Sequence, residues 1–502
     1  MENPNIDNTT AVNAEEDLGE QMKIRREKLA ALKENGCNPY ERTSFPRSCN
    51  SEDIKSDFAA YEGKEVSVAG RIISRRLMGK AGFAHMTDEK GDLQIYVKID
   101  NVGAESYDAW KKTIDIGDIV GIKGTVFLTH KGEISVSVTE LTLLSKALLP
   151  LPEKWHGLKD NDLRYRQRYV DLIANPQVKK CFETRSRIIS AIRNLLDSKG
   201  FVEVETPMLN TVPGGASARP FVTHHNTLDI DMYMRIAPEL YLKRLIVGGF
   251  AKVYELGKMF RNEGMDIKHN PEFTMMELYQ AYADYHDMMD ITEEIYQAAI
   301  KAAGTGDKIV YEGTEIDLTM PWPRLTMLDA IKKYTGADYS DMDAGQALET
   351  ALKLGVQIDD NKTAWGNIVY ATFDQLVEEK LIQPVFITDY PVEESPLAKR
   401  SKEDPRLTYR FEFFIYAREM GNAYSELNDP IDQKERFERQ AKLRASGDDE
   451  AQMTDDDFVT ALEYGLPPTG GLGIGIDRMI MLLTNSSSIR DVMLFPTMKP
   501  KK

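Results

Sequence analysis

The chain has 502 residues, of which 42% are hydrophobic and 28% are charged, and these proportions exclude a largely disordered or fibrous protein. Lys and Arg number 63 against 80 Asp and Glu, so the formal net charge is −17 and a uniformly basic nucleic-acid-binding surface is excluded. A local basic patch is still allowed, because local fields decide binding. The length predicts about three domains.

Cysteine spacing and hydropathy exclude several classes of protein. The cysteines are odd in number and match no zinc pattern, so we expect neither a disulfide framework nor structural zinc; they are Cys37, Cys49 and Cys181. The first twenty residues lack the basic and apolar regions of a signal peptide. No stretch of about 18 apolar residues occurs. We therefore expect a cytoplasmic protein that makes no membrane contact.

Residues 1–62 are predicted to form an acidic tail and a basic helix. Residues 1–20 are polar and acidic, and we expect them to be frayed. Helical spacing of apolar residues follows at Leu18, Met22, Leu29 and Leu32, and Gly36 suits the C-terminal cap. The basic residues of this helix are Lys23, Arg25, Arg26 and Lys28. They fit either a solvated face or an arm that lies along phosphates.

Residues 63–145 alternate between apolar and polar side chains and read as five short strands. Five strands in about 80 residues fit an OB-fold barrel, a fold that often binds single-stranded nucleic acid. Phe83 and Tyr96 are either a stacking surface for bases or part of the barrel core. Polar neighbours that suit base recognition are Arg75, Arg76, Gln94 and Glu133.

A predicted linker over residues 146–180, which begins with Pro150, Pro152 and Gly157, precedes a second domain over residues 181–502. This domain alternates helices and strands, and we expect a helical insertion at about residues 305–400. A helix from Phe182 to about Gly200 leads into the strand FVEVETP, which Pro207 closes.

Residues 253–282 predict an antiparallel strand pair with a charged loop between the strands. The loop carries Arg261, Glu263, Lys268 and His269. On the second strand, Phe273, Glu277 and Tyr279 share a face at period two. A ring, a carboxylate and a phenol on one face are unlike a plain core face.

Residues 409–430 predict another strand pair, with a turn at Ala417–Arg418. Glu412 on the first strand and Glu419 at the start of the second flank a tight connection, so both can reach one hard cation such as Mg²⁺. The alternative is a pair of solvated strand edges. Asn422, Tyr424 and Glu426 are expected to share a face of the second strand.

A glycine-rich strand, TGGLGIG, precedes a predicted helix that carries Arg478 in its first turn. Gly471, Gly473 and Gly475 leave one face of this strand without side chains, which gives room for a flat ligand. The run matches neither a dinucleotide fingerprint nor a P-loop. Taken alone, such a strand is more often a packing device.

Three motifs in order behind a five-stranded barrel, FVEVETP, FRNEGMDIKHNPEFT and GGLGIGIDR, resemble the signature motifs of class II aminoacyl-tRNA synthetases of the lysine/aspartate/asparagine subgroup. SELNDP, MMELYQ, PVEESPLAK and TNSSSIRDVMLFPTMK resemble the bacterial lysine-specific members most closely. The resemblance implies an α+β fold, with an antiparallel sheet flanked by helices. It also implies a homodimer that has Pro207 at its interface. Lys268 replaces the Arg common in the family, which keeps the charge but loses the planar fork.

The resemblance implies an ATP-dependent, AMP-forming ligase. L-lysine would react with ATP to give lysyl-adenylate and pyrophosphate, and lysine would then pass to the 3′ end of tRNA(Lys). Arg261, His269 and Arg478 would be the catalytic residues. The implied ATP-binding residues are Arg261, Glu263, His269, Asn270, Phe273, Glu412, Glu419, Gly475 and Arg478. Mg²⁺ would be held by Glu412 and Glu419.

The implied lysine-binding residues are Glu239, Arg261, Glu277, Tyr279, Asn422, Tyr424 and Glu426. Their three clustered acids suit a long cationic side chain and would repel aspartate. In the barrel, the resemblance assigns anticodon recognition to Arg76, Phe83, Gln94 and Glu133, because splayed bases stack on rings and bond to polar edges.

Two other functions stay open at this point. An aspartyl- or asparaginyl-tRNA synthetase would share the fold, but the three acids disfavour it. A catalytically silent tRNA-binding or regulatory protein would keep the barrel and lose the phosphate-handling groups. The chain retains those groups, which are Arg261, Arg478, Glu412 and Glu419.

Overall fold

The computed structural model describes residues 8–152, 158, 160–359, 361–445 and 453–501. The chain divides into two compact units, Met1–Lys159 and Asp160–Lys502. Residues 1–7 of the predicted acidic tail, and residues 153–157 and 159 of the predicted linker, lie outside the described residues. Among the residues that are described, no helix is both long and apolar enough to cross a membrane.

The first helix of unit 1, α1 (Asn8–Glu34), begins earlier than expected, so the prediction of fraying up to residue 20 is wrong from Asn8 onward. Alanine and glutamate in this stretch are strong helix formers, which explains the extension. Beyond the helix Gly36 has a φ of +72°, and the Cys37 amide donates to the Leu32 carbonyl at 2.8 Å. This left-handed cap closes the helix as predicted.

The five-stranded barrel of unit 1 is confirmed. Its strands are β1 (Glu65–Met78), β2 (Ala81–Thr87), β3 (Asp92–Lys98), β4 (Ile119–Leu128) and β5 (Ile134–Ser145). They close in the order β1-β2-β3-β5-β4, and the β3–β5 pair is parallel while the other pairs are antiparallel. Alternate residues such as Ala84, Ile95 and Val97 fill the barrel, so its outer face carries the intervening side chains.

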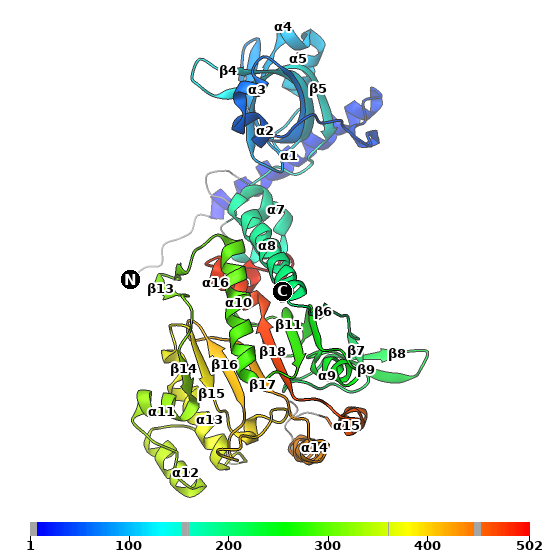
Figure 1. Cartoon of the computed structure of the whole chain (residues 1–502). Coiled ribbons are helices and arrows are strands. Elements are labelled where there is room, and N and C mark those ends of the chain that lie inside the picture. Colours follow the sequence, from blue (N-terminus) through cyan, green and yellow to red (C-terminus); the bar gives the residue numbers. More distant parts are fainter. Residues whose placement is uncertain (1–7, 153–157, 159, 360, 446–452, 502) are drawn as a thin grey trace, which may run out of the picture. The chain divides into compact units, whose positions relative to one another are not determined.

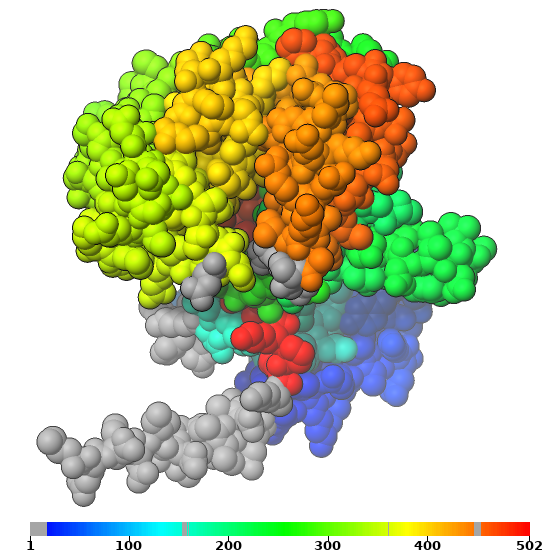
Figure 2. Space-filling model, turned by 90° about the horizontal axis from the view of Figure 1, so that it is seen from below, coloured from blue at the N-terminus to red at the C-terminus, as the bar shows by residue number. Residues whose placement is uncertain are grey.

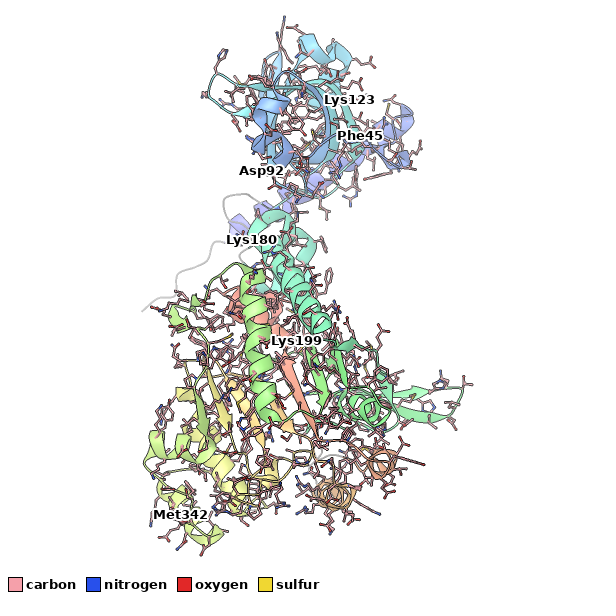
Figure 3. All side chains as sticks on the ribbon, in the orientation of Figure 1. Phe45, Asp92, Lys123, Lys180, Lys199 and Met342 are labelled. Carbon is pink, nitrogen blue, oxygen red and sulfur yellow. The ribbon has the colours of Figure 1, made fainter. Side chains whose placement is uncertain are left out.

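Short helices and a coil segment cover the barrel. The helical elements are η1 (Pro39–Glu41), α2 (Ser51–Ser56), α3 (Phe58–Tyr61), α4 (Ile99–Val102) and α5 (Ala104–Lys112). Phe45 lies against β4, where Gly121 leaves room for its ring (Figure 3). A Cβ at Gly121 would lie 2.5 Å from a ring carbon of Phe45, so the absence of a side chain permits this contact.

Unit 2 is built on an eight-stranded sheet in the order β14-β15-β16-β17-β18-β11-β10-β6 (Figure 1). The six strands from β15 to β10 are antiparallel, and the pairs β14–β15 and β10–β6 at the two edges are parallel. The strands are β6 (Val202–Glu203), β10 (Lys252–Phe260), β11 (Glu272–Ala281), β14 (Arg324–Thr326), β15 (Val385–Thr388), β16 (Arg410–Phe414), β17 (Glu419–Ser425) and β18 (Thr469–Gly475). The expected antiparallel sheet is therefore mixed at its edges.

Helices α8 (Pro176–Ser198) and α10 (Tyr285–Ala303) cross one face of this sheet (Figure 1). Their apolar faces join the largest core through residues such as Ile192 and Ile295. The other helical elements are α6 (Asn161–Arg166), α7 (Arg168–Ala174), α9 (Glu239–Val247), α14 (Pro430–Ala445), α15 (Asp456–Glu463), α16 (Ile476–Leu483) and η4 (Ile489–Asp491). A small separate sheet has the order β7 (Leu209–Asn210), β9 (Ile230–Met234), β8 (Val222–His225).

Residues 305–400 are helical only in part. The helices α12 (Ala344–Lys353) and α13 (Trp365–Leu376) agree with the helical insertion that the sequence predicts here. The same segment also supplies β14 and β15 of the main sheet and the hairpin β12 (Lys308–Tyr311) and β13 (Thr314–Asp317). The remaining helical elements are α11 (Met327–Thr335), η2 (Glu378–Lys380) and η3 (Val392–Glu394). This segment therefore completes one edge of the sheet.

The FVEVETP motif forms only a short strand, Val202–Glu203, instead of a strand from residue 201 to Pro207. Beyond it, the Val204 amide still donates to the Tyr254 carbonyl at 2.9 Å. Pro207 has no N–H with which to continue such pairing. The motif therefore ends as extended chain at the edge of the sheet.

Lys146 is the centre of a buried ionic cluster in unit 1. Its side chain is 0% exposed, and its Nζ lies 2.7 Å from Asp118 and 2.5 Å from Asp115. Lys28 of α1 also reaches Asp115, at 2.6 Å, so this cluster fixes the basic helix to the barrel. Burial opposes the lowered pKa of Asp115, but the hydrogen bonds from Lys146 and Lys28 outweigh it.

Lys146→Met should destabilise unit 1 by about 3–5 kcal/mol, because it leaves the fully buried carboxylate of Asp118 without its cation, while Asp115 keeps Lys28. The deficit should shrink as the pH is lowered through the carboxyl range, since Asp115, whose pKa Lys146 helps to lower, then loses this stabilising contribution in the wild type as well. The matched control is Lys123→Met, because Lys123 pairs with Glu140 at 2.7 Å on the exposed barrel surface (Figure 3). The control should lose much less stability, because solvent screens an exposed ion pair. Urea denaturation of the full chain measures the free energy of unfolding of both variants. Equal losses would contradict the proposed contribution of the buried cluster to stability.

Candidate active site

A cavity of about 330 Å³ opens in unit 2 where β11, β17 and β18 lie side by side. In Figure 2 the surface is hollowed between the yellow and the orange regions of the chain. Phe273, Glu277 and Tyr279 of β11 all line the cavity, which agrees with their predicted common face. Asn422 and Tyr424 line it from β17, and residues 394–398 add a loop wall.

The loop between β10 and β11 places a partly buried cation at one end of the cavity. The guanidinium carbon of Arg261 lies 5.1 Å from the ring centroid of Phe273. Burial lowers the pKa of Arg261, and the negative charge of Glu263 opposes that shift. Among the described residues, Nε of Arg261 and Oδ1 of Asn270 are buried without a hydrogen-bond partner. An unpaired buried guanidinium N–H is suited to an anionic ligand.

Arg478 and His269 form a second cationic group at the same end. An Arg478 Nη lies 3.3 Å from His269 Nε2, and His269 Nδ1 lies 2.8 Å from Asp266 Oδ2. Because a guanidinium only donates, Nε2 accepts and the ring proton resides on Nδ1, which donates to Asp266. Arg478 also donates to the backbone carbonyl of Glu419 at 2.5 Å. Asp266 therefore sets the orientation of the imidazole.

Two carboxylates, those of Glu412 and Glu419, line the cavity beside these cations. Arg410 donates to Glu412 Oε1 at 2.6 Å, and the Tyr390 hydroxyl donates to Oε2 at 3.0 Å. Burial and the negative charge of Glu419 nevertheless raise the pKa of Glu412 to about 7. The pair is therefore an electrostatically strained acidic site that a cation would relieve.

A β-bulge orients Glu419. The register of β16 and β17 shifts between Phe413, which pairs with Gly421, and Phe414, which pairs with Glu419. Glu419 and Asn422 are three residues apart and would point to opposite faces of a regular strand. The bulge lets both line the cavity. The turn before β17 has Tyr416 and Ala417 at positive φ, one residue earlier than the predicted turn.

The other end of the cavity is acidic. Glu239 is 4% exposed, Glu277 is 3% exposed and Glu426 is 0% exposed. Glu239 and Glu277 line the cavity directly, while Glu426 is completely buried. Tyr424 donates to Glu239 at 2.7 Å and Tyr279 donates to Glu277 at 3.0 Å. Three carboxylates thus share a region that is nearly dry.

Sequence reasoning did not single out Lys243, whose ammonium pairs with both Glu239 and Glu426. It lies four residues after Glu239 on α9, a spacing that places both on one helix face and was a usable signal. Arg410, two residues before Glu412 on the same strand face, carried a similar signal. Asp477 was also missed; it accepts from the Thr274 amide at 2.7 Å and from Arg185, which fixes the start of α16.

Burial dominates the titration of the acidic end. It raises the pKa of Glu277 to about 8, and the charge of Glu239 adds to that shift. Burial likewise raises the pKa of Glu426 well above its usual value, while Lys243 opposes the shift. The hydroxyls of Tyr279 and Tyr424 also have raised pKa values because they are buried, so they remain protonated donors.

The glycines of β18 were expected to leave room for a flat ligand, but at Gly471 the protein's own side chains fill that room. A Cβ on Gly471 would lie 2.0 Å from Glu426 Oε1 and 2.5 Å from the Tyr279 ring. At Gly473 the nearest atom would be Met275 Cε at 2.8 Å. At Gly475 the nearest contacts are at 3.6 Å, and one is Arg478. Gly471 therefore accommodates the acidic pocket itself.

Most of the barrel residues singled out for base recognition lie on its outer face, but Gln94 is buried and Arg75 donates to the carbonyls of Trp110 and Ile114 instead. Arg76 pairs with Phe83 across β1 and β2, and the Phe83 and Tyr96 ring centroids are 4.7 Å apart. Gln94 donates to Glu133 at 2.6 Å. Neither ring belongs to the buried core, so the interpretation of both as barrel core is wrong. His85 also contacts Glu133, at 2.8 Å, and sequence reasoning missed it.

Half of the basic residues of the N-terminal helix fit neither of the two interpretations given for them. Arg25 is buried and donates to the Ala147 carbonyl at 3.0 Å, and Lys28 pairs with Asp115. Lys23 and Arg26 are exposed. Half of the basic set therefore fastens the helix to the barrel.

Two family profiles match the chain. The profile described as "tRNA synthetases class II (D, K and N)" matches residues 160–499, and the profile described as "OB-fold nucleic acid binding domain" matches residues 66–144. The chain belongs to the class II tRNA synthetases of the D, K and N group. This confirms the resemblance seen in the three sequence motifs.

Curated relatives match almost the whole chain. The lysine–tRNA ligase of Pelotomaculum thermopropionicum is 60% identical over 491 residues, which is 97% of this chain and 96% of the relative. The lysine–tRNA ligase of Thermoanaerobacter sp. is 58% identical over 500 residues, which is 99% of each chain. That of Moorella thermoacetica is 58% identical over 490 residues, which is 97% of this chain and 99% of the relative.

Gly471→Ala should disrupt the acidic pocket, because the added methyl group would meet Glu426 and Tyr279 at far less than contact distance. Overpacking of this kind is worth about 1–3 kcal/mol, so amino-acid-dependent ATP–pyrophosphate exchange should fall by about tenfold or more at subsaturating amino acid. Gly19→Ala on α1 is the control, since a Cβ there has no atom within 4 Å. Unchanged exchange in Gly471→Ala would show that the pocket does not depend on this close approach.

Proposed function

We propose that the protein is a lysine–tRNA ligase that activates L-lysine with ATP and transfers it to tRNA(Lys). The observation that carries the proposal is the acidic end of the cavity, where Glu239, Glu277 and Glu426 are each less than 5% exposed. Buried carboxylates favour a ligand that brings its own positive charge. The high identity to curated lysine–tRNA ligases over nearly the whole chain supports the same substrate.

In this proposal the two ends of the cavity divide the substrates between them. Glu426 and Tyr279 face the ε-ammonium of lysine, and Glu239 faces its α-ammonium. Asn422 and Arg261 hold the carboxylate, while Glu277 and Tyr424 complete the acidic wall. A buried Glu426 Oε1 without a hydrogen-bond partner among the described residues supports an ammonium ligand here.

The cationic end would hold ATP. Arg261 contacts the α-phosphate, Arg478 and His269 contact the outer phosphates, and Phe273 stacks on adenine. Glu263, Asn270 and Gly475 complete this site. The lysine carboxylate oxygen forms a bond to the α-phosphorus, and the bond from that phosphorus to the bridging oxygen of pyrophosphate breaks. Positioning and charge neutralisation lower the barrier of such a displacement, so no nucleophilic side chain is required.

Glu412 and Glu419 suit Mg²⁺, because burial and mutual repulsion raise the pKa of Glu412 and a cation would relieve both effects. Among the described residues, no group of three or more His, Cys, Asp or Glu could hold a metal. Two carboxylates together with phosphate oxygens are a typical Mg²⁺ arrangement. When bound, the ion would neutralise phosphate charge, while Arg410 and Tyr390 keep the Glu412 carboxylate in place.

The barrel would bind the anticodon of tRNA(Lys). Phe83 offers a stacking surface, while Arg76, Gln94 and Glu133 offer donors and acceptors to base edges. Exposed Lys23 and Arg26 of α1 would meet phosphates, so tRNA affinity should fall with salt. This role suits an OB-fold whose rings lie on the outside of the barrel.

We also propose that the protein acts as a homodimer in the cytoplasm, with the first motif at the interface. Pro207 is exposed there. Exposed apolar side chains surround the motif in sequence and in the adjacent small sheet; they are Val202, Met208, Leu209, Val222, Leu228 and Ile230. An exposed apolar set of this kind is typical of an interface, and a second copy is the occupant that the family resemblance implies.

ATP–pyrophosphate exchange with each amino acid in turn, without tRNA, tests the proposed substrate. We expect exchange with lysine and none with aspartate or asparagine, because the buried acids repel a carboxylate side chain. Exchange with aspartate or asparagine would keep the fold and overturn the assignment of the pocket. No exchange with any amino acid would favour a silent tRNA-binding protein, and the full chain with tRNA added distinguishes this from tRNA-dependent activation.

Phe83→Ala should weaken charging of tRNA(Lys) while lysine-dependent exchange stays normal. Loss of one base-stacking contact is worth about 1–3 kcal/mol, which corresponds to roughly five- to hundredfold in the KM for tRNA. Both activities are measured on the same preparation, so exchange is the internal control. A slower exchange reaction would remove Phe83 from anticodon binding and assign it a structural role.

A further inference from the structure

Lys243 is a lysine side chain with no exposed surface, and its charge is held entirely by the protein. Its Nζ lies 2.6 Å from Glu239 Oε1 and also pairs with the carboxylate of Glu426. The ammonium lies 5.4 Å from the ring centroid of Tyr424 and 5.8 Å from that of Phe458. One internal cation thus joins two of the three pocket acids.

The charges of the acidic end give Lys243 a role beyond packing. An ammonium ligand lowers the raised pKa values of Glu277 and Glu426, so that with such a ligand bound the three acids Glu239, Glu277 and Glu426 carry three negative charges, and Lys243 contributes one positive charge. The remainder of two negative charges equals the two ammonium charges of free lysine, whose carboxylate is assigned to Arg261 at the other end. An amino acid with one ammonium group would leave one buried charge unpaired, which is unfavourable.

We propose that Lys243 is a positioning residue that holds the carboxylates of Glu239 and Glu426 in place and favours the ionised form of Glu426, so that the pocket selects an amino acid with two ammonium groups. This inference rests on the proposed function, because it assumes that these acids face lysine. Lys243 does not line the cavity, so it would act through the two glutamates and would not contact the substrate.

The electrostatic surroundings favour protonation of the acids once Lys243 is removed. Burial raises the pKa of Glu426, and the charges of Glu239 and Glu277 add to the shift, whereas Lys243 opposes it. The other ionisable groups that face the acids are Lys399 near Glu426, Arg261 near Glu277, and the hydroxyls of Tyr279 and Tyr424. Lys399 is partly exposed, so it does not replace an ammonium in direct contact.

The direction in which pH changes lysine binding by a variant without Lys243 follows from the raised pKa of Glu426. Without Lys243, Glu426 holds a proton at neutral pH and attracts the ε-ammonium weakly. Raising the pH removes that proton and restores the attraction, while free lysine keeps its ε-ammonium to about pH 10. A variant without the cation should therefore bind lysine better as the pH rises from about 7 to 9.

The test is lysine-dependent ATP–pyrophosphate exchange by the full chain, with KM values for lysine and ATP from about pH 7 to pH 9. Lys243→Gln keeps hydrogen-bond donors but removes the charge, and Lys243→Met removes both. We expect the lysine KM of each variant to rise about tenfold or more near neutrality and to recover with pH, with the ATP KM within about threefold of wild type. Lys252→Met is the control, because Lys252 is a partly buried lysine that is bonded to the Lys199 carbonyl at 3.0 Å and does not line the cavity (Figure 3 labels Lys199).

A lysine KM that is unchanged, or one that is raised equally at every pH together with the ATP KM, would overturn the role of Lys243. Failure of both variants to fold, with Lys252→Met folded by circular dichroism, would also overturn it, since Lys243 would then serve the fold and not selection. Absence of lysine-dependent exchange in the wild-type chain would instead overturn the proposed function. The two failures are therefore distinguishable.

Discussion

The burial of several like charges in one cavity is the constraint on which the site depends. Three glutamates at one end are nearly inaccessible to water, and each would be costly if left alone. The surrounding protein accommodates them with the ammonium of Lys243 and the hydroxyls of Tyr279 and Tyr424. Gly471 is part of the same solution, because only a residue without a Cβ leaves space for the Glu426 carboxylate and the neighbouring ring.

The opposite end of the cavity carries partly buried cations. Arg261 lies against the Phe273 ring, and Arg478 is fixed by the Glu419 carbonyl and by His269, whose ring is held by Asp266. One set of neighbouring strands carries both ends, since β11 bears Phe273 near the cations and Tyr279 near the acids. A substrate with ammonium groups at one end and a reacting carboxylate at the other fits this polarity, as does a polyphosphate on the cationic side.

Period-two patterns were sufficient to predict the common face of Phe273, Glu277 and Tyr279, and the five strands of the barrel, because strand alternation is a local rule. Local rules failed where tertiary contacts intervene. The bulge that turns Glu419 into the cavity depends on its pairing with β16, and the short extent of the first motif depends on its position at a sheet edge. Phe83 and Tyr96 could not be assigned to the inside or the outside of the barrel until closure set which alternate residues face the core.

The sequence by itself determined the family, the order of the two units and the residue types at both ends of the cavity, since motif spacing and alternation are written along the chain. Only the tertiary structure decided which charges meet. Glu239 and Glu426 are 187 positions apart in sequence, and nothing local indicates that both would share the ammonium of Lys243. Long-range packing brings α9 beside the end of β17. Because the environment there is nearly dry, the ion pairs of Lys243 contribute strongly to the energy of the site. The free energy of a buried charge depends on neighbours that the linear sequence does not specify.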